Sequence, residues 1–332
     1  MSPQFVDLDA DGHLDIVAGI FDGSPHVAFG DGKHWRQPEQ ILDKEGQRIV
    51  MNAWWNFDKK QWDKTHRCDA EGAPELEGHL TSAWAYDWDH DGDLDLLLGD
   101  HTSGQVLLRV NEGSATKPAF ATRNTVVTAA GEPLVVPGTV TTLRTIDWNG
   151  DGRDDLLVGS MGDAYSGGEG GGVLVYLDTA TEGAPTTLIE RSHKGADQAT
   201  RPDSGLYMDA VDHDGDGDLD LVVGGYAHWT PAAPALDEAQ QQRLNELRER
   251  VGVLTTRIQE LNAEMLAAQE GLDAEAARQK RMEMAKDPAR EKVFAERAEA
   301  VAEIEKLSPG MKRESFVWLY ENVGGGKVGG GH

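Results

Sequence analysis

Cysteine is nearly absent from this chain of 332 residues, since Cys68 is the only one. A single cysteine excludes a disulfide framework, a haem attachment motif and a cysteine-rich zinc site. No segment reaches the roughly eighteen consecutive apolar residues that a membrane-spanning helix needs. No signal peptide opens the chain, and Met1 leads almost directly into Phe5 and Val6 of a repeat, so we expect an N-terminus that is cut or mis-started.

Basic residues are also scarce. The chain has 31 Lys and Arg residues against 58 Asp and Glu residues, which gives a formal net charge of −27. An excess of this size argues against nucleic acid or an anionic membrane surface as the partner. The length is compatible with two ordinary domains or with one large repeat domain.

Many of the acidic residues fall in a nine-residue loop that occurs four times, most clearly from Asp87 to Asp95. Side-chain oxygens occupy loop positions 1, 3, 5 and 9. They belong to Asp7, Asp9, Asp11 and Asp15; Asp87, Asp89, Asp91 and Asp95; Asp147, Asn149, Asp151 and Asp155; and Asp212, Asp214, Asp216 and Asp220. Position 6 is glycine in each copy, as a tight turn requires. At position 7 we expect the backbone carbonyl to be a ligand, in His13, Asp93, Arg153 and Asp218.

This pattern predicts calcium binding. Several carboxylates in one loop repel each other unless a hard cation lies among them, and Ca²⁺ accepts about six to eight oxygen ligands. We therefore expect about four Ca²⁺ ions, one per loop. The alternative is a set of acidic surface turns without metal, but four copies in one strand context favour metal. The third loop should bind most weakly, because Asn149 removes a charge and Arg153 adds a cation.

The residues after each loop exclude an EF-hand, which has glutamate at position 12 and then a helix. Position 12 is apolar here in every copy, being Ala18, Leu98, Val158 and Val223. Each apolar run ends in glycine one residue later, which indicates a buried strand. The loops begin 80, 60 and 65 residues apart, and each lies between short apolar segments. Three or four strands per repeat are typical of propeller blades.

The loop, the apolar run ending in glycine and the segment from Val106 to Gly113 resemble FG-GAP/VCBS repeats. The resemblance covers about residues 3–230 and 315–323. It implies an all-β, integrin-α-like propeller with Ca²⁺ loops between the first and second strands of each blade. Only four blades are visible, whereas such propellers usually have seven or more. The blades therefore form a compact ring, an open arc or part of a longer ring.

Residues 34–80 lengthen the first repeat and contain Trp35, Trp54, Trp55, Phe57 and Trp62. These aromatic residues are expected to pack over a blade or to plug a ring, and the alternative is stacking on sugar rings. Trp88 and Trp148 are interpreted as packing between blades. The nearby sequence from His66 to Asp69, with the lone Cys68, is interpreted as structural. The segment from Gly167 to Gly172 is interpreted as a flexible hairpin tip, since it lacks the ending of a phosphate-binding loop.

Residues 236–307 have a helical composition. Apolar residues alternate in steps of three and four from Leu244 to Met265, and a second helical segment follows at 273–307, with a kink or restart at Asp287-Pro288. We therefore predict an antiparallel coiled-coil hairpin inserted in the last blade, with blades at 1–235 and a final strand and Gly-rich tail at 308–332. A projecting arm is favoured over a helical lid.

The sequence favours a secreted, periplasmic or surface scaffold that binds protein or self-associates, because a millimolar-range Ca²⁺ module suits an extracytoplasmic setting. The alternative is a carbohydrate-binding module or polysaccharide-degrading enzyme that uses the Trp-rich insert. No acid–base pair is apparent outside the loops, so we expect no catalytic activity.

Overall fold

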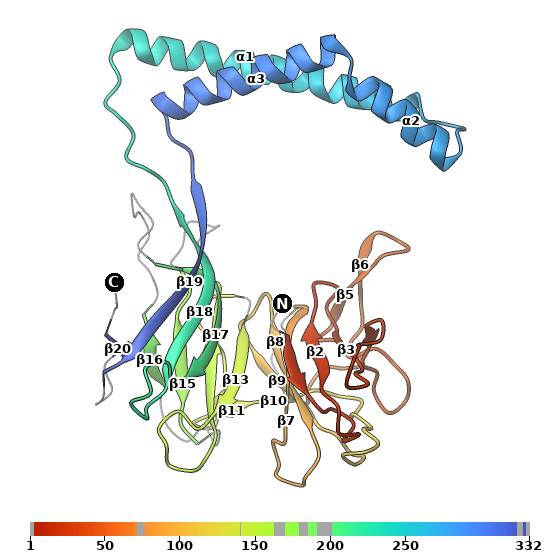
Figure 1. Cartoon of the computed structure of the whole chain (residues 1–332), viewed down its shortest axis with the longest axis vertical. Coiled ribbons are helices and arrows are strands. Elements are labelled where there is room, and N and C mark those ends of the chain that lie inside the picture. Colours follow the sequence, from red (N-terminus) through yellow and green to blue (C-terminus); the bar gives the residue numbers. More distant parts are fainter. Residues whose placement is uncertain are drawn as a thin grey trace. The chain divides into compact units, whose positions relative to one another are not determined.

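The computed structural model describes residues 3–71, 77–139, 141–162, 170–178, 185–190, 201–323 and 328–329. The chain divides into two compact units. The first comprises Met1–Gly195, Ala199–His228 and Arg313–His332, and the second comprises Ala196–Gln198 and Trp229–Lys312. Figure 1 shows strands in the first unit and helices in the second.

Within the described ranges, the first unit contains four four-stranded antiparallel sheets. The first sheet consists of β1 (Gln4–Val6), β2 (Asp15–Gly19), β3 (Pro25–Ala28) and β4 (Glu39–Gln40). The second consists of β7 (Leu80–Tyr86), β8 (Asp95–Asp100), β9 (Val106–Arg109) and β10 (Thr125–Val126). The third consists of β13 (Thr142–Ile146), β14 (Asp155–Gly159), β15 (Val173–Tyr176) and β16 (Thr186–Ile189). The fourth consists of β17 (Ser204–Val211), β18 (Asp220–Trp229), β19 (Lys312–Asn322) and β20 (Val328–Gly329).

Two small hairpins form separate two-stranded sheets. One pairs β5 (Ala53–Asn56) with β6 (Gln61–Lys64), and the other pairs β11 (Thr128–Ala129) with β12 (Glu132–Pro133). The β5–β6 hairpin carries three of the tryptophans of the insert, and Trp62 packs against His79 with ring centroids 4.4 Å apart. Other residues of the insert, Ile41 and Ile49 among them, enter the core. This partly agrees with the prediction that the insert packs over a blade.

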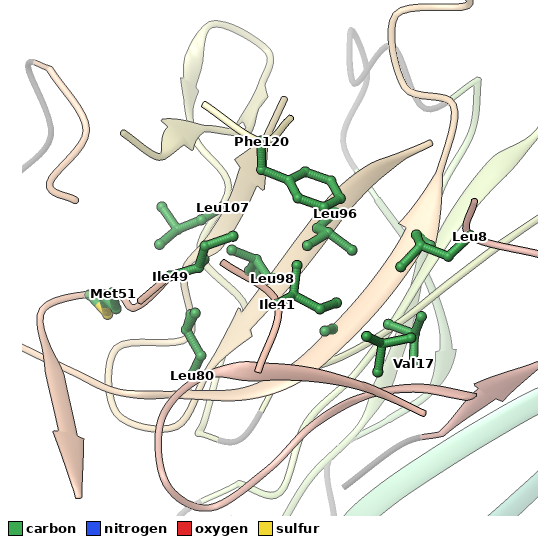
Figure 2. Close-up of a cluster of buried hydrophobic side chains, with 13 residues drawn as sticks. Leu8, Val17, Ile41, Ile49, Met51, Leu80, Leu96, Leu98, Leu107 and Phe120 are labelled. Atoms are coloured by element: carbon green, nitrogen blue, oxygen red, sulfur yellow. The ribbon is translucent and has the colours of Figure 1, made fainter. Parts of the chain in front are cut away.

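Successive sheets pack face to face because side chains alternate between the two faces of each strand. The core between the first and second sheets contains Val17 from β2 with Leu96 and Leu98 from β8, as Figure 2 shows. A second core lies between the second and third sheets, and a third between the third and fourth. Trp88 and Trp148 pack against the second and third cores, as predicted.

The glycine that ends each apolar run permits this close packing. A Cβ atom on Gly99 would lie 2.2 Å from the carbonyl oxygen of Thr141, next to the first strand of the following sheet. Gly159 faces the carbonyl oxygen of Leu206 in the same way, at 2.4 Å. A side chain at either position would therefore push the neighbouring sheets apart.

No closed ring is seen in the described part of the chain. The first strand of each later sheet packs against the preceding sheet, but the fourth sheet has no comparable packing against the first. Of the three arrangements that the sequence left open, a compact closed ring of four blades is therefore not found.

The helical unit is inserted between β18 and β19 (Figure 1). It contains α1 (Glu238–Ala267), α2 (Ala274–Ala285) and α3 (Pro288–Leu307), so the predicted second helix is divided in two. Asp287 caps α3 and Pro288 begins it, which explains the division, because proline cannot continue a preceding helix. No helix among the described residues is long and apolar enough to cross a membrane.

Helices α1 and α3 pack against each other in antiparallel orientation. Arg243 near the start of α1 makes a bidentate ion pair with Glu303 near the end of α3, with Nε–Oε1 and Nη2–Oε2 distances of 2.7 and 2.8 Å. Leu244, Leu247 and Leu261 are buried, as the alternating spacing predicted for seam positions. Whether this pair is a coiled coil stays a prediction.

Candidate metal-binding loops

Each of the four acidic loops connects the first strand of a sheet to the second. The glycines at position 6 have φ angles between +86° and +99°, a conformation that other residues rarely adopt. Position 4 is also left-handed, at Ala10, His90, Gly150 and Gly215. The sequence pattern did not indicate this second requirement, because two of the four residues carry side chains.

The carboxylates at positions 1 and 5 fold the loop by accepting backbone hydrogen bonds. Asp7 Oδ2 accepts from Gly12 N at 2.8 Å, and Asp147 Oδ2 accepts from Gly152 N at 2.9 Å. Asp11 Oδ1 accepts from His13 N at 2.9 Å. These bonds hold the acidic side chains on the inner side of the turn, where their charges are close together.

Three of the loops bring carboxylate oxygens close enough to share one ion. The groups are Asp7, Asp9 and Asp15; Asp87, Asp89 and Asp91; and Asp212, Asp214 and Asp216, with one oxygen of each residue within 4.8 Å of the others. Acidic groups of this kind are also common on surfaces without an ion, so proximity alone does not distinguish a metal site from an acidic turn.

The same three loops contain carboxylate oxygens that are buried and lack a hydrogen-bond partner. Asp9 Oδ1, Asp87 Oδ1, Asp93 Oδ1 and Asp218 Oδ1 are in this state within the described residues. A buried polar atom without a partner costs about 1–3 kcal/mol, and more when it is charged. These oxygens therefore fit a ligand that is a cation. Asp93 was expected to contribute only its backbone, whereas its side chain is buried.

The pKa values of these groups reflect the crowding. Burial and then the charges of Asp11 and Asp15 raise the pKa of Asp9. Burial, followed by the neighbouring acidic charges, likewise raises the pKa of Asp93 and of Asp218. Burial raises the pKa of Asp95 to about 6. Without a counter-ion, burial and mutual repulsion thus disfavour the charged form of these four carboxylates.

The aspartate at position 9 has a structural role that its place in the pattern did not reveal. It is buried in every sheet and both of its oxygens accept backbone hydrogen bonds. In the second sheet, Asp95 Oδ2 accepts from Trp88 N at 3.1 Å and Asp95 Oδ1 accepts from Asn111 N at 2.7 Å. The bonds at Asp15, Asp155 and Asp220 are equivalent. This residue therefore ties the loop to the chain that leaves the third strand.

The third loop differs from the others. Arg153 extends over it, and its Nη2 lies 3.0 Å from Asp151 Oδ2 and 2.9 Å from Asp178 Oδ1. The hydrogen bond from Arg153 lowers the pKa of Asp151. The side-chain amide of Asn149 also donates to Asp151 Oδ2 at 3.1 Å. An internal cation thus already balances part of the charge in this loop.

The other candidates from the sequence have structural roles or lie outside the described residues. Cys68 is buried and its thiol lies 3.6 Å from the carbonyl oxygen of Arg48. His66 is exposed and contacts Asp69 through Nδ1 and Oδ2 at 2.8 Å. The first half of the glycine-rich tip, residues 167–169, lies outside the described residues, whereas Gly170 to Gly172 are described.

One grouping that the sequence did not signal lies in the fourth sheet. Ser204 Oγ lies 3.0 Å from Asp203 Oδ1, to which it donates, and 3.5 Å from His228 Nδ1. The residue types match a hydrolytic triad, but Ser204 is fully buried and its proton is directed to Asp203. A nucleophile must reach its substrate, so we interpret this grouping as part of the core.

Comparison with known families supports the repeat. Residues 87–158, from the start of the second loop to β14, match the family model of an FG-GAP-like repeat. A search of the curated proteins found no match. An FG-GAP-like repeat is thus present in the middle of the chain, while the more specific likeness to integrin-α propellers stays a prediction.

Proposed function

We propose that this protein is an extracytoplasmic scaffold of FG-GAP-type blades that are stabilised by Ca²⁺ and that bind a protein partner. The FG-GAP-like repeat suggests a protein-interaction or adhesion scaffold, and such repeats are typical of extracellular proteins. The observation that supports calcium is the set of buried carboxylate oxygens without partners in the first, second and fourth loops.

In this proposal the residues at positions 1 and 3 hold the ion, together with position 5 in the second and fourth loops and with Asp15 at position 9 in the first. They would supply the hard oxygen ligands that Ca²⁺ prefers, and the carbonyl at position 7 would add another. Bound Ca²⁺ would neutralise the loop, while the aspartate at position 9 keeps the loop tied to the third strand. Each ion would thereby fix the turn between the first two strands of a blade.

The helical hairpin is the second interaction element of the proposal. Its outer surface is rich in charged residues, and exposed pairs such as Lys280 with Glu283 contribute at most about 1 kcal/mol each. Their side chains can therefore exchange one partner for another at small cost. The proposal assigns no catalytic step to either unit.

A capture experiment tests this function. The full chain, immobilised in Ca²⁺, should retain a protein from an extract of its native source, and retention should fall when EGTA replaces Ca²⁺. A variant with Asp11→Ala, Asp91→Ala and Asp216→Ala should behave in Ca²⁺ as the wild type does in EGTA. Asp58→Ala, an exposed acidic residue outside the loops, is the matched control. If retention of the partner is unchanged both in EGTA and in the triple variant, a Ca²⁺-dependent scaffold is ruled out.

The carbohydrate alternative rests on two exposed rings of the insert, Trp35 and Phe57. Trp62 is less available, since Phe21 and His79 already pack against its ring. If a polysaccharide quenches the fluorescence of the wild type but not of Trp35→Ala, this alternative should replace the protein partner.

A further inference from the structure

The repeats allow equivalent positions in the four sheets to be compared, and the fourth sheet differs from the others. The residue two places after the position-9 aspartate faces the next sheet in the first three sheets, where Val17, Leu97 and Leu157 are completely buried. Its equivalent in the fourth sheet, Val222, is only half-buried. The face that should meet a following sheet is therefore present but incompletely covered.

The third strands of the sheets show the same difference in burial, and the difference is larger there. The backbone N–H groups of Asn111, Asp178 and Asn322 make the same hydrogen bond to a position-9 aspartate, which fixes the alignment of the three strands. Five residues before these donors lie Val106 and Val173, both fully buried, and Val317, which is 81% exposed. An apolar side chain that is buried in two sheets is thus exposed in the last.

Two further features, one of packing and one polar, agree with this difference. A Cβ on Gly224 would have its nearest contact at 3.8 Å, whereas its equivalents Gly99 and Gly159 meet the next sheet at 2.2 and 2.4 Å. Gln4 lies three residues before the first loop. Its side-chain amide accepts a hydrogen bond from the N–H of Ala85 in the next sheet at 2.7 Å and donates one to the carbonyl oxygen of Ala85 at 2.9 Å. Asp209 occupies that position in the fourth sheet and is exposed.

The first sheet shows the converse. The residue after the position-9 aspartate faces the preceding sheet, and Leu96, Leu156 and Leu221 are fully buried there, but Ile16 is half-buried. Two residues before the loop, Ala85 is buried, whereas Phe5 is 59% exposed. Phe5 contacts the exposed ring of Trp35, with centroids 5.9 Å apart. The first sheet therefore carries an exposed apolar face on the side opposite the second sheet.

We propose that the exposed face of the fourth sheet binds the exposed face of the first sheet in a second copy of this chain. We define the tail face by Asp209, Val222, Gly224 and Val317, and the head face by Phe5, Ile16 and Trp35. The contact continues the arrangement of the three interfaces inside the chain, so each face already has its complement on the same molecule. Asp209 accepts a hydrogen bond from the N–H of Phe5, as Gln4 does from that of Ala85.

The pairing is head to tail, because the two faces are different surfaces. Two copies that close on each other join two sets of four sheets, a number at the upper end of the roughly four to eight blades usual in propellers. Each copy carries a formal charge of −27, so repulsion opposes the pairing and added salt strengthens it. The inference concerns the exposed faces of the first and fourth sheets and does not depend on calcium.

Sedimentation of the full chain tests the pairing. At about 100 μM protein and 0.5 M salt, the wild type should reach twice the 36.1 kDa mass of the chain. Val317→Glu and Phe5→Glu should each sediment as monomers, with self-association weakened at least about ten-fold, because a buried unpaired charge is strongly unfavourable. Both side chains are largely exposed in one chain, so neither change should disturb folding. Val253→Glu, at a valine in α1 that is 65% exposed, is the matched control and should still pair.

Mixing the two variants gives the sharpest result. Val317→Glu keeps an intact head face and Phe5→Glu keeps an intact tail face, so the mixture should form a mixed dimer that neither forms alone. A monomeric wild type, or a mixture that stays monomeric, overturns the proposal. Loss of the dimer in Val253→Glu would assign the contact to the helices and overturn it also. Hydrogen exchange of the unmodified protein gives an independent readout. Raising the protein concentration should slow amide exchange in Gln4–Val6 and Lys312–Asn322.

Discussion

Substitution of the position-9 aspartate and of the position-5 aspartate in one loop should affect stability differently. The clearest comparison is between Asp95→Ala and Asp91→Ala. Asp95 is 1% exposed and accepts hydrogen bonds from Trp88 N and Asn111 N, whereas Asp91 is exposed and accepts one local bond from Asp93 N. We therefore expect Asp95→Ala to destabilise the protein with or without Ca²⁺. Asp91→Ala should matter only when Ca²⁺ is present.

The loss of folding stability expected for Asp95→Ala combines two opposing effects. Two buried N–H groups lose their acceptor, at about 1–3 kcal/mol each. Removing the carboxylate also removes the cost of ionising it in the native state. Because the pKa of Asp95 is raised from 3.8 to about 6, this cost is at most about 3 kcal/mol at pH 7. The net loss of stability should be about 2 kcal/mol in EGTA. For Asp91→Ala it should be within about 0.5 kcal/mol of zero, as for other exposed sites.

Urea unfolding in EGTA and in saturating Ca²⁺ measures both quantities. A bound ion at one hundred times its Kd adds about 2.7 kcal/mol to the native state, and Asp91→Ala should lose most of one such contribution. Equal stability of the two variants in EGTA would refute the assignment of Asp95 to the backbone bonds. An equal response of Asp91→Ala and wild type to Ca²⁺ would refute the assignment of Asp91 to the ion.

Three further predictions follow from the loops and the insertion. In the third loop, Asn149→Asp and Arg153→Ala should each raise Ca²⁺ affinity, by several-fold in calorimetric titration, because each makes the loop more negative; unchanged affinity in both would contradict the role given to charge. Lowering the pH from 7 to 5 should shrink the Ca²⁺-induced rise in Tm, since the pKa of Asp95 is about 6 in the metal-free protein. Without Ca²⁺, lowering the pH should instead stabilise the protein. A carboxyl group whose pKa is raised in the native state adds stability that is complete below about pH 4 and is lost as the pH rises through 6. A deletion that joins Pro231 to Pro309 through a Gly-Ser turn should keep the Ca²⁺-dependent melting transition by circular dichroism, and failure to fold would show that the helices belong to the core of the sheets.

Local periodicity was enough to predict the strands and the loops that connect them. The apolar run after each loop forms a strand, as at Leu96 to Gly99, because a short continuous apolar run with a terminal glycine is encoded within a few residues. The break before Pro288 was also local, since proline removes a helical hydrogen bond wherever it falls.

Features that depend on distant residues could not be predicted in the same way. The backbone partner of Asp95 at Asn111 is set by the packing of the third strand, and nothing in the loop indicates it. Arg153 was recognised as a nearby cation, but its contact with Asp178 depends on where β15 ends. The exposure of Val317 depends on which distant segments pack against β19, and no pattern within β19 can reveal that.

The most direct test of the account is a count of bound ions. Native mass spectrometry of the EGTA-treated chain, titrated with Ca²⁺, should show up to four ions, with the fourth appearing at higher Ca²⁺ and disappearing in Asp147→Ala. The Tm should rise in parallel with the first three. A chain that takes up no Ca²⁺ and melts at the same temperature in EGTA would show that the loops are acidic turns, and would contradict the account.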